Sequence, residues 1–174
     1  MNYRKKSFCL VLISVLCLST FHGCATKKEV TCPFTGMTWE NTLEEIQAAE
    51  GELINSYDSI YQGTTYEYSK EYQGMEGTIK YIFDSEDKLM SMAWLYIPES
   101  GEDLEHVYEL LVEETTSSYG ESGFGSQQTG AKGQVWYLDG GNILIAVMST
   151  GVNEAIQYQF FHPEVSSEKP RSDK

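Results

Sequence analysis

Cysteine is scarce in this chain, and its placement excludes an internal disulfide in the folded domain. The 174 residues contain four cysteines, and three of them, Cys9, Cys17 and Cys24, fall within or just after an apolar N-terminal stretch. Only Cys32 lies further along the chain. A single cysteine cannot form a disulfide within the domain, so a hydrophobic core has to stabilise the fold. We expect Cys32 to lie unused on a tether, with an intermolecular disulfide or a metal-binding role as the alternatives.

Basic residues are also scarce. The chain has 12 lysines and arginines against 26 acidic residues, and the stretch from Glu29 to Glu168 holds 25 acids and four lysines. Nucleic-acid backbones and anionic lipid headgroups attract the opposite charge, so direct binding to either is disfavoured. The excess of acidic residues is typical of a soluble extracytoplasmic surface. The more specific alternative is that these residues bind a basic or cationic partner.

No hydrophobic run is long enough for a permanent membrane-spanning helix, which needs about 20 residues. The longest run, Phe8 to Leu18, follows Arg4, Lys5 and Lys6 and leads to Gly23-Cys24. A basic patch followed by a short apolar run is typical of a secretory signal. We therefore predict that residues 1–23 are a signal peptide.

The pair Gly23-Cys24 resembles the lipobox of bacterial lipoproteins. That resemblance implies that Cys24 becomes the acylated, palmitate-bearing first residue of the mature chain. It places the protein on the extracytoplasmic side of a bacterial cell membrane, held there by lipid. The alternative is an ordinary secretory signal that happens to be followed by cysteine.

Two segments carry helical signals. Thr42 and Glu45 have the spacing of a capping box, and Gly51 provides a stop, which predicts a short helix over 42–50. A longer helix is predicted over 100–119, because apolar residues recur there at helical spacing. Its apolar stripe consists of Leu104, Val107, Tyr108, Leu111, Val112 and Thr115.

Tyrosine-rich and β-branched runs predict strands after each helix. The glycine-rich stretch 120–133 between the second helix and its strands is predicted to be a loop. The predicted strands are 53–61, 65–72, 78–83 and 89–97 in the first group, and 134–139, 143–149 and 155–161 in the second.

This order predicts an α+β fold made of two units, each a helix followed by an antiparallel meander (α-β4-α-β3), with the helices packed on the sheet. We expect a tether over 24–37 and a single domain over 38–162. The alternative is that this domain consists of two tandem halves, 38–98 and 99–162. The polar residues 163–174 are expected to form a flexible tail.

The segment Trp39 to Gly51 resembles the opening helix of small bacterial envelope lipoproteins of the SmpA/BamE type. The matching positions are Thr42 as cap, Glu45 as box partner, Ile46 as core contact and Gly51 as helix stop. The repeated helix-then-meander order also resembles the β-lactamase-inhibitor-protein fold. Both resemblances imply a binding or assembly protein rather than an enzyme.

Catalytic and cofactor motifs are missing from the sequence. His106 and His162 have no cysteine or paired histidine at metal-ligand spacing, and the acidic residues of the second helix sit at solvated positions. We predict neither a catalytic site nor a cofactor.

Aromatic residues are the most informative candidates for binding. On the strand 89–97 both faces are apolar, so one of them is free either to contact a second layer or to meet a partner. The alternative is that these aromatics pack under the helix 100–119 or between two sheets. The candidate binding residues are Tyr66, Tyr68, Trp94, Tyr96 and Trp136.

The expected function is therefore that of a lipid-anchored, non-enzymatic module that binds or assembles an envelope protein through its sheet face. Two alternatives remain from the sequence: a cell-wall hydrolase with an acidic pair, and an inhibitor of an envelope enzyme. We expect no nucleic-acid partner, and the sequence leaves the oligomeric state open.

The anchor gives the first prediction. Replacing Cys24 with alanine should abolish acylation, because the thiol is the atom that would carry the lipid. Labelling with a fatty-acid analogue measures this, and Cys32→Ala is the matched control that should keep full incorporation. Equal labelling of the Cys24→Ala and wild-type chains would disprove the lipoprotein assignment.

Overall fold

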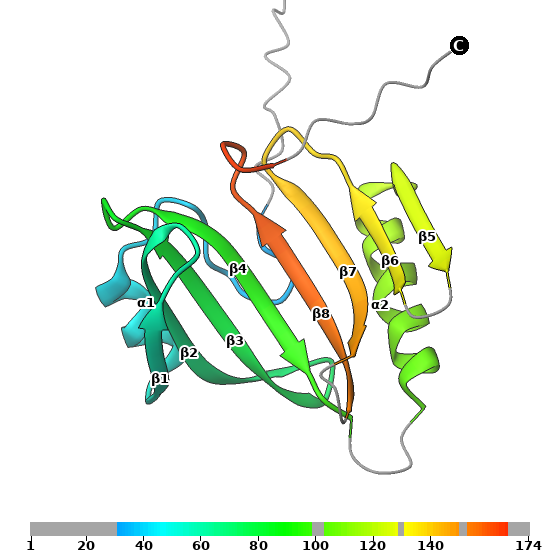
Figure 1. The fold of residues 1–174 in the computed structure, drawn as a ribbon, viewed down its shortest axis with the longest axis horizontal. Helices are drawn as coiled ribbons and strands as arrows, with labels where there is room; N and C mark the ends of the chain where they lie inside the picture. Colours follow the sequence, from blue (N-terminus) through cyan, green and yellow to red (C-terminus); the bar gives the residue numbers. More distant parts are fainter. Residues whose placement is uncertain (1–30, 99–102, 129–130, 150–152, 167–174) are drawn as a thin grey trace, which may run out of the picture.

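The computed structural model describes residues 31–98, 103–128, 131–149 and 153–166. Along this part of the chain a helix and four strands are followed by a second helix and four more strands (Figure 1). The elements are α1 Leu43–Glu50, β1 Leu53–Asp58, β2 Gln62–Tyr72, β3 Met75–Asp84, β4 Leu89–Tyr96, α2 Leu104–Tyr119, β5 Phe124–Gln128, β6 Ala131–Trp136, β7 Asn142–Ser149 and β8 Glu154–Phe161.

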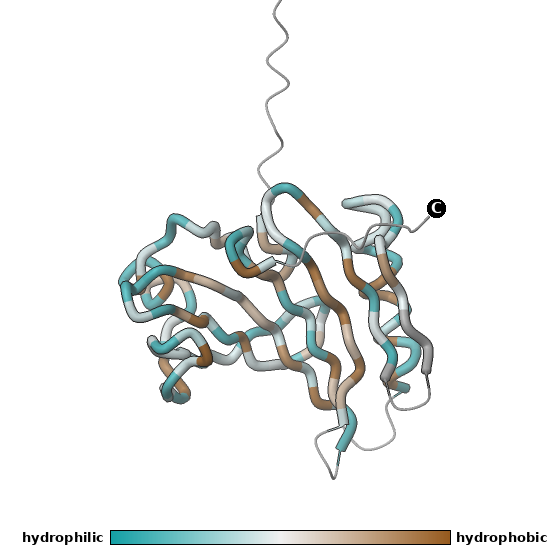
Figure 2. Tube along the Cα trace, turned by 45° about the horizontal axis from the view of Figure 1, so that its top comes forward, coloured by the Kyte–Doolittle hydropathy of each residue, from teal (hydrophilic) through white to brown (hydrophobic). Residues whose placement is uncertain are grey.

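All eight strands belong to one antiparallel sheet in the order β1-β2-β3-β4-β8-β7-β6-β5. The first four strands form one meander and the last four form another, and the pairing of β4 with β8 joins them. In that junction Trp94 lies opposite Tyr158, and Met92 lies opposite Phe160. Hydrophobic residues are concentrated along these middle strands (Figure 2).

The predicted architecture of two helix-plus-meander units is wrong. The strands form one continuous sheet, the second group has four strands instead of three, and the helices share the covering of one face with the N-terminal segment 31–42. α1 buries only Ile46, while α2 packs near β7 and β8. The physical reason is that β4 is apolar on both faces and hydrogen-bonds to β8, which merges the two meanders around one core.

α1 begins where its capping box predicts, whereas α2 begins at Leu104, later than the predicted start at residue 100. In α1 the Thr42 hydroxyl accepts from the Glu45 amide, and the Glu45 carboxylate accepts from the Thr42 amide, which completes the capping box. The Asp103 side chain caps α2 by accepting two backbone N–H bonds. Each helix ends at a glycine with positive φ, Gly51 and Gly120, where a side chain would strain the backbone.

The N-terminal segment 31–42 supplies part of the layer that the helices do not. Cys32, Phe34 and Thr35 are buried, and the Phe34 ring makes an edge contact with Tyr158 at 5.0 Å between centroids. The expected tether over 24–37 is therefore wrong for its final residues, since they are part of the core. The burial of these residues could not be predicted, because the segment is too short to show apolar periodicity.

Two further boundaries differ from the prediction. The stretch 124–128, expected to be loop, is the edge strand β5, which pairs with β6 alone. An edge strand needs one partner only, so it tolerates the glycine and polar residues that hid it. The expected flexible tail over 163–174 is wrong for its first residues, because Ser166 accepts from the backbone N–H of Asn142 and donates to the carbonyl of Phe161.

The stripe of α2 provides the second prediction. Leu111 is 1% exposed and the adjacent Leu110 is 48% exposed. Leu111→Ala should therefore lower the free energy of unfolding by about 2 to 5 kcal/mol, whereas Leu110→Ala should lower it by about 1 kcal/mol or less. Urea denaturation of both variants measures the difference, and equal losses would contradict the packing of this helix.

Candidate functional site

The expected aromatic binding platform is not on the surface. Tyr68, Trp94, Tyr96 and Trp136 are at most 5% exposed, and Tyr66 is half-buried. They lie on the face of the sheet that the helices and residues 31–42 cover, as the burial of Ile79 and Tyr81 on the same face also shows. These aromatics form the core, as the alternative interpretation held, and they are not available to a partner.

The contacts of Trp94 show how firmly this face is packed. Its indole N–H donates to the carbonyl of Lys70 at 3.0 Å, and its ring stacks on Tyr96 with centroids 5.5 Å apart. A Cβ at Gly77 would approach the indole nitrogen to 2.6 Å. The tryptophan therefore fills a space that the neighbouring strand leaves free by having glycine there.

The opposite face of the sheet has no helix over it among the described residues (Figure 1). We call it the open face. Because side chains alternate along a strand, it is formed by the residues between the buried aromatics. One row of cross-strand partners on it is Glu67, Lys80, Ala93, Gln159, Leu144, Val135 and Phe124. The next row is Thr78, Leu95, Gln157, Ala146 and Gly133.

The centre of the open face is uncharged but hydrogen-bonded. The Gln159 amide donates to the Ser91 hydroxyl at 2.7 Å, and the Gln157 amide donates to Gln159. Ser91 in turn donates to the carbonyl of Phe160. The row satisfies its own buried polar atoms, so the centre can be covered by another molecule without leaving them unpaired.

An apolar hollow lies beside this row. It has a volume of about 220 Å³, and its walls are Val135, Tyr137, Asn142, Leu144, Phe161 and Val165. Such a volume suits one apolar side chain rather than a large ligand. The exposed Phe124 lies next to it, across from Val135.

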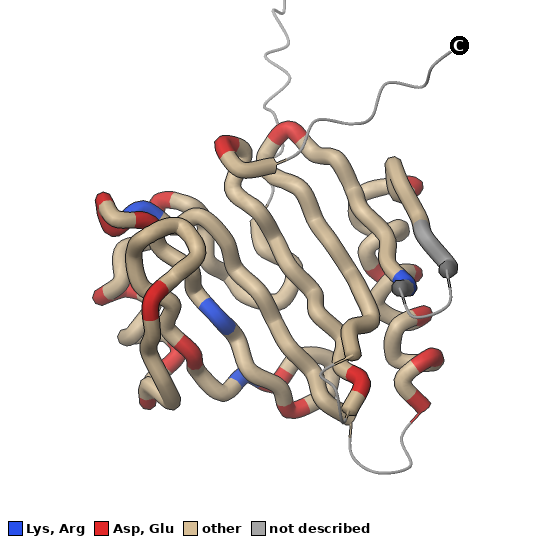
Figure 3. Tube along the Cα trace, viewed as in Figure 1, with Lys and Arg blue, Asp and Glu red and all other residues tan. Residues whose placement is uncertain are grey.

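Charge is nearly absent from the middle strands of the sheet and is found on the flanking strands, the loops and the helices (Figure 3). β4 and β7 contain no charged residue, and β8 contains only Glu154 at its start. On β2 and β3, Glu67 and Lys80 form an ion pair at 2.7 Å. Burial raises the pKa of Glu67, but hydrogen bonds from Lys80 and Tyr57 outweigh it and hold that pKa below its usual value.

Every lysine in the described part of the chain pairs with a glutamate. The pairs are Lys70–Glu50, Lys80–Glu67, Lys88–Glu164 and Lys132–Glu105. The acidic residues far outnumber these four lysines, so the surface around the open face is strongly negative. A surface of this sign attracts basic partners and repels acidic ones.

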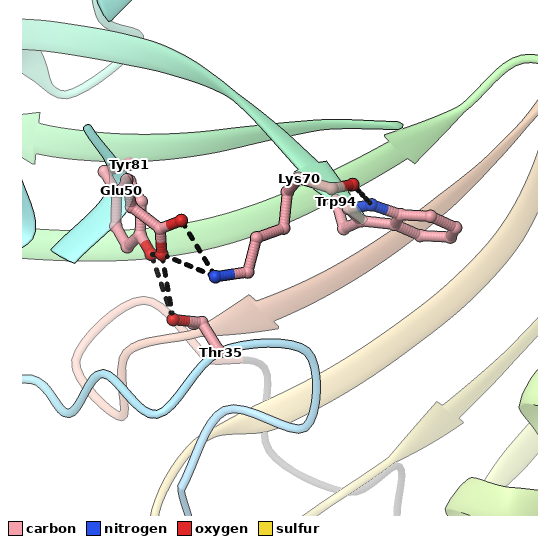
Figure 4. Close-up of polar contacts among 5 residues, drawn as sticks. All are labelled: Thr35, Glu50, Lys70, Tyr81 and Trp94. Carbon is pink, nitrogen blue, oxygen red and sulfur yellow. Dashed lines mark hydrogen bonds and ion pairs between the residues drawn. The ribbon is translucent and has the colours of Figure 1, made fainter. Parts of the chain in front are cut away.

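A buried polar cluster fixes the N-terminal segment beneath the sheet (Figure 4). The Glu50 side chain, 2% exposed, accepts from Lys70 Nζ at 2.8 and 3.0 Å and from the Tyr81 hydroxyl at 2.6 Å. The Thr35 hydroxyl donates to the same carboxylate at 3.2 Å. The cluster thus joins the end of α1, two strands and residues 31–42 through one carboxylate.

Cys32 is next to this cluster and is 3% exposed. Burial raises the pKa of its thiol above the ordinary value, although neighbouring backbone hydrogen bonds oppose the shift. A protonated, enclosed thiol is a poor nucleophile and metal ligand. Within the described residues no group of His, Cys, Asp and Glu side chains could hold a metal ion.

No family model, curated protein or solved structure matches the chain. Within residues 31–166, as far as the structure describes them, neither helix is long and apolar enough to cross a membrane. Cys24 and the predicted signal peptide lie outside the described residues.

The buried ion pair leads to the third prediction. Lys70→Met should lower the free energy of unfolding by about 3 to 5 kcal/mol, because it leaves the Glu50 carboxylate buried without its cation. Lys88→Met is the matched control at an exposed pair and should cost about 1 kcal/mol or less. Urea denaturation measures the free energy of unfolding of each variant. A similar small loss of this free energy in both would mean that the Glu50 charge does not need Lys70.

Proposed function

We propose that this chain is a lipid-anchored, extracytoplasmic, non-enzymatic module that binds a protein of the bacterial envelope through the open face of its sheet. The observation that carries the proposal is the contrast between the two faces of the sheet. One is covered by the helices and the N-terminal segment, and the other has an uncharged centre, an apolar hollow and an acidic surround.

This pattern fits the anatomy of protein interfaces. Their centres are poor in charge and hold a few apolar anchors, and their rims are polar. Here Leu95 and Leu144 are half-buried and Phe124 is 53% exposed, so apolar surface is available around the hydrogen-bonded glutamines. The acidic surround favours a partner whose rim is basic.

The position of the N-terminal segment is compatible with an anchor. The Tyr119 hydroxyl, at the end of α2, donates to the carbonyl of Thr31 at 3.2 Å, so the chain enters the domain on the helix side. Six residues lie between Cys24 and Thr31, so the two are seven residue steps apart, a distance of roughly 25 Å at most. An anchor of that reach would hold the domain close to the membrane and leave the open face unobstructed.

Site-specific photocrosslinking tests the proposal and forms the fourth prediction. A benzophenone amino acid at position 144 on the open face should give a discrete protein adduct in cells that produce the full chain. The same probe at position 47, an exposed position on α1, should give none. Equal adducts at the two positions, or none at position 144, would contradict binding through the open face.

A matched pair of glutamine substitutions sharpens the test. Gln157→Glu places a charge at the uncharged centre and should lower the adduct yield at position 144 by about tenfold, because burying an unpaired charge opposes association. Gln47→Glu makes the same chemical change on α1 and should leave the yield unchanged. Thermal midpoints of both variants establish that the fold is intact.

A further inference from the structure

A second concave surface lies on the helix side of the sheet, away from the open face. It is a groove of about 630 Å³ between one flank of α2 and the turn that joins β2 to β3. Its lining consists of Gln73 and Met75 from the turn, and His106, Val107, Leu110, Leu111, Glu113, Glu114 and Ser117 from α2.

The floor of the groove is apolar. Val107 and Leu111 are buried in the stripe that faces the core, and Met75 packs against the same core. Leu110 stands beside that stripe and is 48% exposed. A leucine exposed next to an apolar floor extends the hydrophobic surface from the core out to the wall of the groove.

The rim of the groove holds a carboxylate that is fixed in place by neutral donors. The Tyr72 hydroxyl donates to one oxygen of Glu114 and the Gln73 amide donates to the other, each at 2.9 Å. Burial, followed by the hydrogen bond to Glu114, raises the pKa of the Tyr72 phenol above its ordinary value. All four lysines of the described residues pair with other glutamates, so none of them neutralises Glu114.

The groove has the length of a short peptide. Its lining follows α2 from His106 to Ser117, a distance of roughly 16 Å at 1.5 Å per residue. An extended chain of about five residues covers that distance. A lysine or arginine side chain would lay its methylene stem on the apolar floor and place its cation against Glu114, with Glu113 beside it.

From this combination we propose that the groove binds an extended segment of a partner protein, in which a lysine or arginine lies two residues from a leucine-sized apolar side chain, so that both point to the same side of the segment. The groove is separate from the open face, so the proposal goes beyond the function assigned above. His106 is the one lining side chain that can become cationic, and it lies more than two turns of α2 away from Glu114.

The test uses the full-length chain in nonionic detergent and a blocked, fluorescently labelled heptapeptide that carries a leucine and a lysine two residues apart, on the same side of the extended chain. Leu110→Ser and Glu114→Gln should each weaken the peptide affinity by about tenfold or more, since they remove the apolar contact and the anion. Glu109→Gln makes the same charge change on α2 outside the groove and should weaken it less than about twofold. Fluorescence anisotropy measures the affinities, with peptide binding to detergent alone subtracted.

Several results would overturn the proposal. An equal loss in Glu109→Gln and Glu114→Gln would indicate general attraction to an acidic protein, and an unchanged affinity in Leu110→Ser would remove the apolar floor from the site. Saturable binding of octylammonium without binding of the peptide would exclude a polypeptide occupant. Leu110 is exposed, so that variant remains informative even if loss of the Tyr72 bond destabilises Glu114→Gln.

Discussion

The pairing of β4 with β8 is the interaction on which the rest of the molecule depends. It joins strands that are distant in sequence and aligns Met92, Trp94 and Tyr96 with Phe160, Tyr158 and Ile156 on one face. Without it each meander would present a long hydrophobic edge, which is a site for aggregation. With it, one aromatic wall extends across the middle of the sheet, and both Phe34 and the α2 residue Thr115 contact its Tyr158.

The same pairing determines what the other face can do. Side chains alternate, so a row of large aromatics on the covered face leaves Ser91, Ala93, Gln157 and Gln159 facing the opposite way. Ser91 and Gln159 are already buried and bond to each other, and the half-buried Gln157 donates to Gln159, so a partner that covers this row leaves these groups paired, whereas charged groups would resist being covered. An uncharged open face is therefore the counterpart of the aromatic core behind it.

Local signals in the sequence identified the local elements and failed where long-range contacts decide. The capping box at Thr42 predicted α1 and the apolar stripe predicted α2, because each signal depends on neighbours within a few residues. Alternation showed that Trp94 and Tyr96 share a face, but the identity of the covered face depends on residues 31–42, which carry no periodicity. The glutamines of the open face were missed because polar residues in a strand give no sign of a site until the pairing of β4, β8 and β7 brings them together.

The acidity of the chain affects the two candidate surfaces in the same way: it favours a basic partner at each. The open face and the groove lie on opposite sides of the sheet, and each has a neutral or apolar centre. Acidic residues predominate around the first, and Glu114, which pairs with none of the four described lysines, lines the second. Two copies of a chain with this charge repel each other at every approach that brings these rims together. Apolar contact between two copies would have to overcome that repulsion. A basic partner, in contrast, gains from the apolar contact and from the attraction between opposite charges. The four lysines of the described residues already pair with glutamates, as Lys70 does with Glu50 beneath the sheet, so none of these four is left to complete either surface.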